Sequence, residues 1–514
     1  MLPPTRANSW PNYNAVPVDE VSWSVAYRCQ GSRRLPVAIA SVPHDVGYCV
    51  RPAQRSACGV GSAASGSPLG VERLGRRACL SRAARWAAAA YVGFVQRREL
   101  LVSAAALAGG TALLGGLTSC GASGDLVRAN VTRTRPELQR VGSTVDAVGR
   151  FGLDLLARLG TGSNLVCSPL SVLVAYGMVR NGAAGATAAE MDRALRLPAL
   201  DDLNAGMNLI DQTLAKRSGK RGTGNRKGEV YLDLANAVWG QQGYEWEQPF
   251  LQTLASDYGT GVHPTDFAKD GAAARKAINV WVADRTRDKI TDIATPEVVN
   301  ADTRLALVNA LYARAPWADP FAAVGEQPFA VGGEQVPVAM IRSADSPRYL
   351  SGTGWQGARI PLLGDELALT VVRPDRDVGG LLTSLTKSGL ASLLRPEPTD
   401  LVDLTLPTFT VRSTVDLEPP LTDLGLKTAF SNAAEFPGLT RTDQLKLQAA
   451  RHMGYLALDE NGIEAAAATI VTAEPVSGSP APDHKLVVDR PFLFVLHDLE
   501  LRLPLLTGVV VDPR

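Results

Sequence analysis

The chain has 514 residues, in which 52 Lys and Arg balance 51 Asp and Glu, so its formal net charge is +1. This length allows two to four domains of roughly 100 to 200 residues, or one large domain with extensions. The charge balance excludes nucleic-acid binding driven by overall charge, and the 46% hydrophobic content predicts a well-buried globular core.

Residues 1–94 lack sustained helical or strand periodicity, and they mix Cys, Arg, Ser, Pro and Gly. Four of the six cysteines lie here, and only Cys167 follows Cys120, which excludes a disulfide framework for the rest of the chain. We expect no packed domain in this segment. It is either an over-extended reading frame, with the true start near Val92 or Val95, or a disordered extension.

Residues 95–120 have the layout of a signal peptide. An arginine pair precedes an uncharged run rich in Ala, Leu and Gly from residue 100 to 117, and the segment ends at Cys120. The Leu-Thr-Ser-Cys ending resembles a bacterial lipobox, whose cysteine becomes the lipidated first residue after cleavage. An uncleaved membrane anchor and plain secretion are the alternatives. We therefore expect a secreted or cell-surface lipoprotein, lipid-anchored at the extracellular side of the membrane, with residues 121–140 as a polar tether.

Residues 141–514 show the patterns of a folded domain. Helical periodicity predicts three early helices, at Val145–Leu159, Ser168–Arg180 and Thr187–Leu195, the last with a capping box of Thr187 and Glu190. Strand-like runs follow at Val230–Trp239, Arg304–Ala313, Leu367–Arg373 and Leu401–Phe409. Because helices come early and strands later, the order indicates an α+β fold and not repeating βαβ units.

Motifs for catalysis, cofactors and metals are weak or missing. Residues 352–357 match a dinucleotide-binding string, but Pro361 argues against the helix that would hold a pyrophosphate, so we expect a turn between strands. The sequence has no Gly-x-Ser-x-Gly nucleophile elbow, and its cysteines and histidines show no zinc-binding spacing. We therefore expect no enzymatic activity, no metal and no cofactor.

Six basic residues fall within the twelve positions from Lys216 to Lys227, interleaved with Gly and Ser and without an aromatic residue. This composition predicts a solvated loop. Docking of an anion such as a sulfated glycan or nucleic acid is the alternative, although the chain as a whole gives no reason to expect a nucleic-acid partner.

The most unusual stretch runs from Asp459 to Pro482 and contains four consecutive alanines. Read alone, the alanines suggest a short helix. Read by alternation, one face carries a Glu at each end, and the other is small and apolar, with Ile463, Ala465, Ala467, Thr469, Val471 and Ala473. Such a segment is able to lie exposed as a loop and also to enter a sheet as a strand, because small side chains lose little rotamer entropy on ordering.

The order of motifs from residue 145 to 513 resembles the serpin family. The matching segments are residues 164–171, 181–191, 234–237, 278–282, 307–312 with Trp317, 406–409, 424–426 with 429–430, and 490–494. The resemblance implies an α+β serpin fold with three β-sheets, about eight to nine helices and an exposed reactive-centre loop. It also implies a monomeric serine protease inhibitor that acts by suicide-substrate trapping.

In this family the segment from Glu460 onward is the hinge of the reactive-centre loop. A target protease cleaves the loop and forms an acyl-enzyme, and the cut loop then inserts as a new central strand that carries the distorted protease away. The resemblance assigns the hinge to Glu460, Gly462, Ile463, Glu464, Ala465, Ala466, Ala467 and Ala468. It places the reactive bond between Val476, the seventeenth residue from the hinge glutamate, and Ser477, or a few residues later toward Ser479.

A small β-branched residue after proline, as at Val476, suits the shallow apolar pocket of elastase-like proteases and supplies no cation for a trypsin-like pocket. A chymotrypsin-like target is the second candidate.

The resemblance also implies two clusters that control opening of the main sheet. Ser168, Ser171, Asn309 and His452 match the family's shutter, and Trp317 matches its breach. The alternatives are a helix cap for Ser168 and a satisfied core position for His452.

One position departs from the family pattern. Ile463 stands where inhibitory members usually have Thr or Ser, and a bulkier side chain there is expected to slow loop entry. The alternative function is therefore a non-inhibitory serpin-fold protein that acts as a cleavable substrate or binding module.

Overall fold

The computed structural model describes residues 25–26, 37–38, 126–135, 140–223, 226–394, 398–448, 451–464 and 482–514. The chain divides into two units, Met1–Gly115 and Gly116–Arg514. In the first unit the described residues form two short antiparallel strands, β1 (Val25–Ala26) and β2 (Val37–Ala38). Cys120 and the apolar run before it lie outside the described residues. None of the helices that are described is long and apolar enough to cross a membrane.

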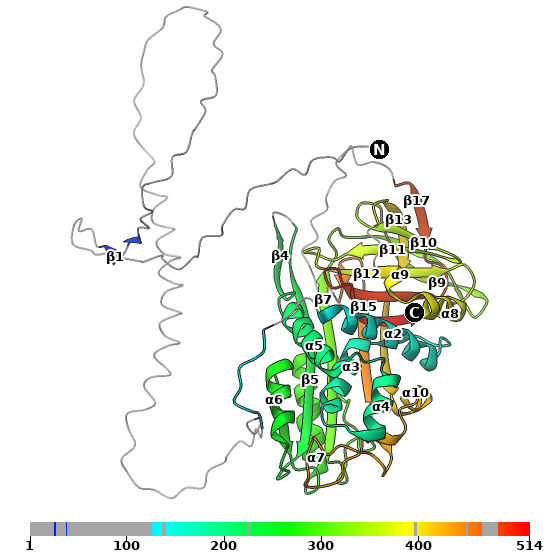
Figure 1. Cartoon of the computed structure of the whole chain (residues 1–514). Helices are drawn as coiled ribbons and strands as arrows, with labels where there is room; N and C mark the ends of the chain where they lie inside the picture. Colours follow the sequence, from blue (N-terminus) through cyan, green and yellow to red (C-terminus); the bar gives the residue numbers. More distant parts are fainter. Residues whose placement is uncertain are drawn as a thin grey trace, which may run out of the picture. The chain divides into compact units, whose positions relative to one another are not determined.

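The second unit contains nine α-helices among its described residues (Figure 1). They are α2 (Val141–Leu159), α3 (Pro169–Arg180), α4 (Gly185–Ala194), α5 (Leu200–Leu214), α6 (Gln248–Asp257), α7 (Gly271–Arg285), α8 (Val378–Ser388), α9 (Ala391–Leu394) and α10 (Glu418–Asp423). A 3-10 turn, Thr428–Phe430, follows the last helix.

Three β-sheets accompany these helices in the described part of the second unit. The six-stranded sheet has the order β10 (Arg348–Gly352), β11 (Trp355–Pro361), β12 (Leu367–Pro374), β18 (Phe492–Asp498), β19 (Leu503–Val510) and β3 (Leu165–Cys167). The four-stranded sheet has the order β17 (His484–Val487), β13 (Val402–Pro407), β9 (Glu334–Ser343) and β8 (Ala322–Val331). The seven-stranded sheet has the order β14 (Phe409–Asp416), β15 (Arg451–Leu458), β16 (Gly462–Ile463), β7 (Leu305–Pro316), β5 (Arg226–Gln241) and β4 (Gly219–Thr223), with β6 (Val262–Thr265) also paired to β5.

Local sequence explains where α3 begins. Ser168 is the N-cap, and its hydroxyl accepts a hydrogen bond of 3.1 Å from the backbone N–H of Ser171. Pro169 occupies the first helical position, where its missing N–H leaves no bond unmade. The helix cap considered as an alternative role for Ser168 is therefore confirmed.

The predicted capping box of Thr187 and Glu190 is wrong. Helix α4 begins at Gly185, so both side chains lie inside the helix and are free to make tertiary contacts. The Thr187 hydroxyl accepts from the backbone N–H of Glu435, and the Glu190 carboxylate accepts from Thr428. Contacts with a distant segment replace the local cap that the sequence suggests.

The four predicted strand-like runs all form strands, and one of them is divided between two strands. The 352–357 string contains the turn between β10 and β11, as predicted: β10 ends at Gly352 and β11 begins at Trp355. The run Leu401–Phe409 splits, because β13 ends at Pro407 and β14 begins at Phe409 in a different sheet. Proline cannot donate to a strand ladder, which explains why the run breaks at this point.

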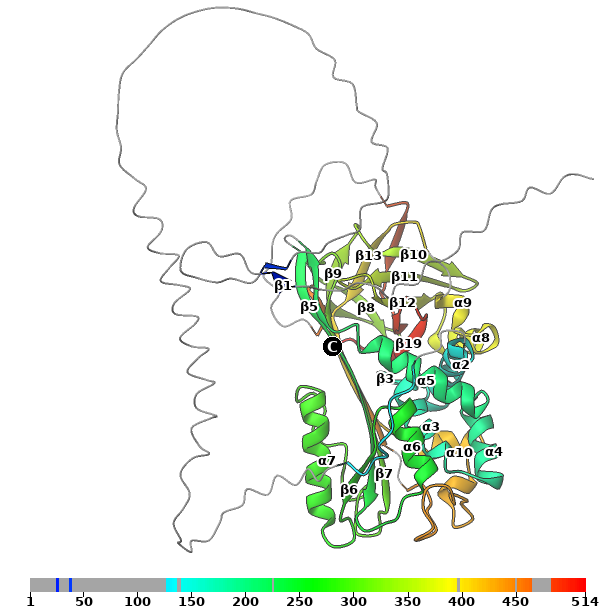
Figure 2. The ribbon, with the colours of Figure 1, turned by 60° about the vertical axis from the view of Figure 1, so that its left-hand side comes forward.

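Different helices cover the two faces of the seven-stranded sheet. Figure 2 shows α7 on one side of β5, β6 and β7, with α3, α5 and α6 on the other side. Alternation along β7 produces this division: Leu311 and Ala313 join the main core, whereas Val308 and Ala310 join the smaller cluster beneath α7. The sheet is therefore buried on both faces around β7.

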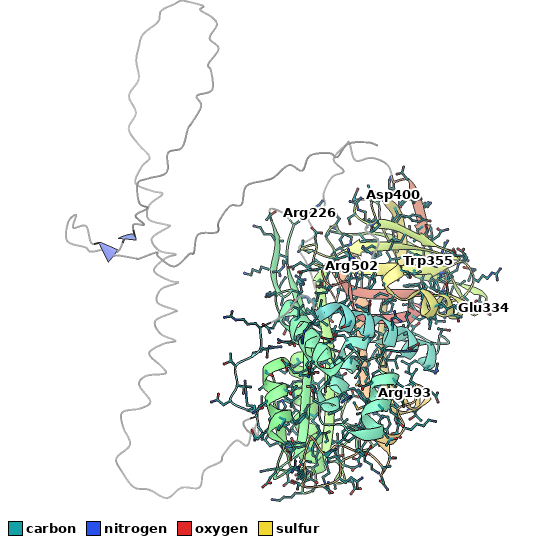
Figure 3. The ribbon with its side chains drawn as sticks, in the orientation of Figure 1. Arg193, Arg226, Glu334, Trp355, Asp400 and Arg502 are labelled. Atoms are coloured by element: carbon teal, nitrogen blue, oxygen red, sulfur yellow. The ribbon has the colours of Figure 1, made fainter. Side chains whose placement is uncertain are left out.

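The described residues of the basic segment 216–227 include two paired strands where its composition predicts a solvated loop. Strand β4 pairs antiparallel with the start of β5, and Arg226 lies at the free end of this hairpin (Figure 3). The Arg217 side chain is only 7% exposed and forms ion pairs with Asp498 at 2.7 Å and Glu500 at 2.6 Å. A buried guanidinium requires such partners. Part of the basic charge is therefore neutralised within the protein, which weakens the case for anion docking.

Residues 126–135, within the segment predicted as a tether, lie against the domain. Val127 and Val262 of β6 exchange two backbone hydrogen bonds of 2.9 Å. The guanidinium of Arg133 pairs with Asp211 of α5 at 2.6 Å. The segment is thus bonded to the sheet edge and to a helix.

Candidate functional site

The hinge segment enters the seven-stranded sheet at β16. Ile463 pairs antiparallel with Ala315 of β7 on one side and with Leu458 of β15 on the other. Its side chain is fully buried in the main core. Gly462 precedes it at a point where a Cβ would collide with the Ala315 carbonyl oxygen. The isoleucine that departs from the family pattern is thus already seated in the sheet.

A tight turn directs the chain into β16. The Asp459 carboxylate accepts a hydrogen bond of 3.2 Å from the backbone N–H of Gly462. Trp317, the predicted breach residue, is buried, and its indole N–H donates to the Asp459 carbonyl at 2.9 Å. The backbone N–H of Phe321 donates to the carbonyl of Glu460, also at 2.9 Å. The start of the hinge is therefore fixed by the segment that follows β7.

Glu464, the last described residue of the hinge, departs from extended strand geometry. Its backbone N–H still donates to the Ala457 carbonyl at 2.9 Å, but its φ of +44° lies in the left-handed region that non-glycine residues rarely adopt. Its carboxylate lies 3.0 Å from Lys289 Nζ, and this contact raises the pKa of the ammonium. Burial raises the pKa of Tyr312 on β7, and the charge of Glu464 raises it further. The carboxylate thus joins β7 to the segment after α7.

The four residues predicted as a shutter meet beneath β7 and β15, and all are buried. His452 Nε2 accepts from the backbone N–H of Ser168 at 3.0 Å, and His452 Nδ1 lies 3.1 Å from Asn309 Oδ1. Because Nε2 is an acceptor, the single proton of the neutral ring lies on Nδ1 and is donated to Asn309. Burial lowers the pKa of His452 to about 4. The imidazole therefore links α3 to the two strands that flank the hinge.

Two buried hydroxyls, one within this cluster and one on the same helix, have no hydrogen-bond partner within the described part of the chain. They belong to Ser171 and Tyr176, both on α3. Burial raises the pKa of the Tyr176 phenol, and nearby carboxylates raise it further. Tyr176 also lines a cavity of about 40 Å³ together with Leu305 and Asn309 of β7. The hydroxyls of Ser171 and Tyr176 are therefore able to make further hydrogen bonds.

The other predicted site residues lie outside the described residues: Ala465, Ala466, Ala467, Ala468, Val476, Ser477 and Cys120. Sequence reasoning missed Lys289 and Tyr312, whose contacts with Glu464 appear only in the folded chain. Tyr312 falls in a motif that the resemblance uses, but no sequence signal marks Lys289. The turn after α7, where Arg287 and Asp288 have positive φ, brings Lys289 to the hinge.

Comparison with known proteins gives consistent matches over this region. The Serpin (serine protease inhibitor) family model matches residues 146–513. An uncharacterized serpin-like protein of Thermococcus kodakarensis is 29% identical over 376 residues, which cover 72% of this chain and 86% of that protein. The leukocyte elastase inhibitor of Bos taurus is 30% identical over 365 residues, which cover 68% and 93%. The native structure of the thermophilic serpin Tengpin has a TM-score of 0.64 at 24% identity and covers 75% of this chain and 97% of that chain, which shows a shared fold.

Proposed function

Because this chain belongs to the serpin family and has the serpin fold, we propose that it traps serine proteases by inserting its cleaved reactive-centre loop into the seven-stranded sheet. The family is one of serine protease inhibitors, which bind proteases and are not enzymes themselves. The observation that carries the proposal is the position of Ile463 between β7 and β15, because it starts a new strand in a defined register.

We extend this register to the later loop residues in the proposed inserted state. Since both pairings are antiparallel, each step beyond Ile463 moves one residue back along β7 from Ala315 and one along β15 from Leu458. Ile463 points into the main core, so the odd-numbered residues follow it there: Ala465, Ala467, Thr469, Val471 and Ala473. This is the small apolar face that alternation in the sequence predicts. Insertion in this register would therefore bury the face of the loop that carries small, mostly apolar side chains.

Thr469 reaches the shutter in this register. Six residues beyond Ile463, it falls between Asn309 and His452, on the side of the sheet where α3 lies. The hydroxyls of Ser171 and Tyr176 lie on that side without a partner in the described chain. A threonine hydroxyl suits this level because it both donates and accepts hydrogen bonds.

The length of the slot agrees with the predicted reactive bond. Strand β7 begins at Leu305, ten residues before Ala315, so residue 473 is the last that it can pair. At about 3.3 Å per residue, this stretch spans about 33 Å. Val476 lies three residues further on, which would carry an acylated protease past the far end of the sheet. Each new ladder hydrogen bond contributes about 1 kcal/mol, so insertion is downhill.

An elastase-like protease is the proposed target. Val476 presents a small apolar side chain for a shallow specificity pocket. The similarity to a leukocyte elastase inhibitor supports this choice.

Incubation with an elastase-like protease tests the proposal. A complex that survives boiling in detergent is expected on a denaturing gel, with cleavage after Val476 in the fraction that escapes. A trypsin-like protease serves as the control. Its acidic specificity pocket requires a basic residue, and Val476 is uncharged, so it should form little complex. Cleavage by several serine proteases without a stable complex, and without a gain in thermal stability, would favour a cleavable substrate or binding module instead.

Lipid anchoring at Cys120 is a second proposal, supported by the signal-like layout of residues 95–120. Because residues 126–135 lie against the domain, only residues 121–125 separate it from the anchor. Five residues span about 18 Å at most, so the domain would stay close to the membrane.

Export is tested by fractionation and mass spectrometry. The native protein should appear in the membrane fraction and begin with a diacylated Cys120. Cys120→Ala should release it or block its processing. Peptides from residues 10–80 in the mature protein would show that the start site and the signal are both misplaced.

A further inference from the structure

The carboxylate of Glu464 lies at the level of the slot that residue 466 takes during insertion. The register places residue 466 between Tyr312 and Tyr455. The positive φ of Glu464 brings its carboxylate back to the Tyr312 phenol and to Lys289. The Lys289 ammonium in turn lies 5.4 Å from the ring centre of Tyr455. The Glu464–Lys289 pair therefore bridges the slot directly below the seated hinge.

Lys289 is held in place by its surroundings. In the turn after α7, the Thr286 hydroxyl donates to the Val282 carbonyl at 2.8 Å and accepts from the backbone N–H of Ile290 at 3.1 Å. The guanidinium of Arg412 on β14 donates to the backbone carbonyl of Lys289. The ammonium is therefore presented to the hinge by a backbone that is already ordered.

The Glu464–Lys289 ion pair is partly buried. The Glu464 side chain is 13% exposed and the Lys289 side chain 37% exposed. Partial burial strengthens an ion pair relative to one fully in water. Tyr312 of β7 is buried, and the charge of Glu464 helps to raise the pKa of its phenol.

We propose that Lys289 is a positioning residue that clasps Glu464 and stops the intact loop from inserting beyond Ile463. The clasp deepens the proposed function and rests on it, because it controls the same insertion step. Residue 466 can enter between Tyr312 and Tyr455 only after the carboxylate leaves, so the contact opposes premature insertion. Cleavage frees the far end of the loop and allows Glu464 to become extended.

Spontaneous conversion of the purified, uncleaved protein tests the clasp. The protein is held at raised temperature without protease, and the inserted form is counted by its resistance to urea on a gel. Lys289→Met should convert about fivefold faster than wild type, as expected for loss of a partly exposed ion pair. Lys289→Arg should restore a rate close to that of wild type. Lys276→Met removes an exposed lysine of α7 as a matched control and should leave the rate unchanged.

Double substitution distinguishes a clasp from unrelated destabilisation. Glu464→Gln should also speed conversion, and Lys289→Met should then add little, because both changes remove the same contact. Fully additive effects, equal rates in all variants, or no conversion in any of them would overturn the clasp. Trapping by the wild type is scored separately with protease. A missing covalent complex overturns the proposed function, whereas the conversion rates report on the clasp alone.

Discussion

Ala467→Glu is expected to abolish trapping and leave a protein that proteases cleave and release. If the loop inserts in the register of Ile463, residue 467 would pair between Leu311 and Gly454, on the side of the sheet that Ile463 and Leu311 face. A Cβ at Gly454 would already collide with the Val166 carbonyl, so this level offers little space. A buried carboxylate costs several kcal/mol unless it is paired, so insertion slows and hydrolysis of the acyl bond comes first. The covalent complex should fall at least about tenfold on a denaturing gel.

Ala466→Glu provides the matched control. Residue 466 would point to the opposite face, between Tyr312 and Tyr455 and beside Lys289, where a carboxylate meets a cation. Trapping should therefore persist in this variant. An equal loss of complex in both variants would show that the register inferred from Ile463 does not continue into the inserted strand.

Local signals in the sequence were sufficient for the α+β class and for α3, since Ser168 and Pro169 mark its start. They failed where tertiary contacts compete with local ones. Thr187 bonds to a distant backbone instead of capping a helix. Arg217 likewise reads as part of a solvated basic loop until Asp498, 281 residues away, neutralises it. Composition reports the charge of a segment but not which carboxylates the fold brings to it.

The candidate site likewise combines features that the sequence indicates with features that only the fold reveals. Asn309 and His452 are 143 residues apart, so only the resemblance to a family could place them together before the fold was known. Alternation in the sequence predicts a small apolar face for the hinge, and of that face the described residues include only Ile463, which is buried in the main core. The seating of Ile463 depends instead on the separation of two strands, and the contact of Lys289 depends on a turn after α7. Neither has a signature in the residues nearby.

Acidification should destabilise the native protein through His452 by about 3 kcal/mol between pH 6.5 and pH 4. Because burial lowers the pKa of this histidine in the folded state, the unfolded chain takes up a proton first as the pH falls. Stability is therefore full above about pH 6.5, declines toward pH 4 and levels off below it. His497 is also buried, and burial with the charge of Arg359 lowers its pKa to about 3, so its share of the loss extends to lower pH. Urea midpoints measured across this range report the sum.

His452→Gln separates the two histidines and links the pH effect to function. A glutamine can accept from the Ser168 N–H and donate to Asn309, as the neutral imidazole does, but it cannot take up a proton. Its stability should fall about 3 kcal/mol less than that of wild type on going from pH 7 to pH 4. His497→Gln should still lose, on acidification, the part of the stability that depends on His452.

Protonation of His452 should also affect function. A proton on Nε2 would face the Ser168 N–H, break the link between α3 and β15, and loosen the slot below Ile463. Wild type should therefore lose its capacity to trap protease faster at pH 5 than at pH 7.5, and His452→Gln should lose it at similar rates. Parallel pH curves for the two proteins would show that His452 does not hold the sheet closed.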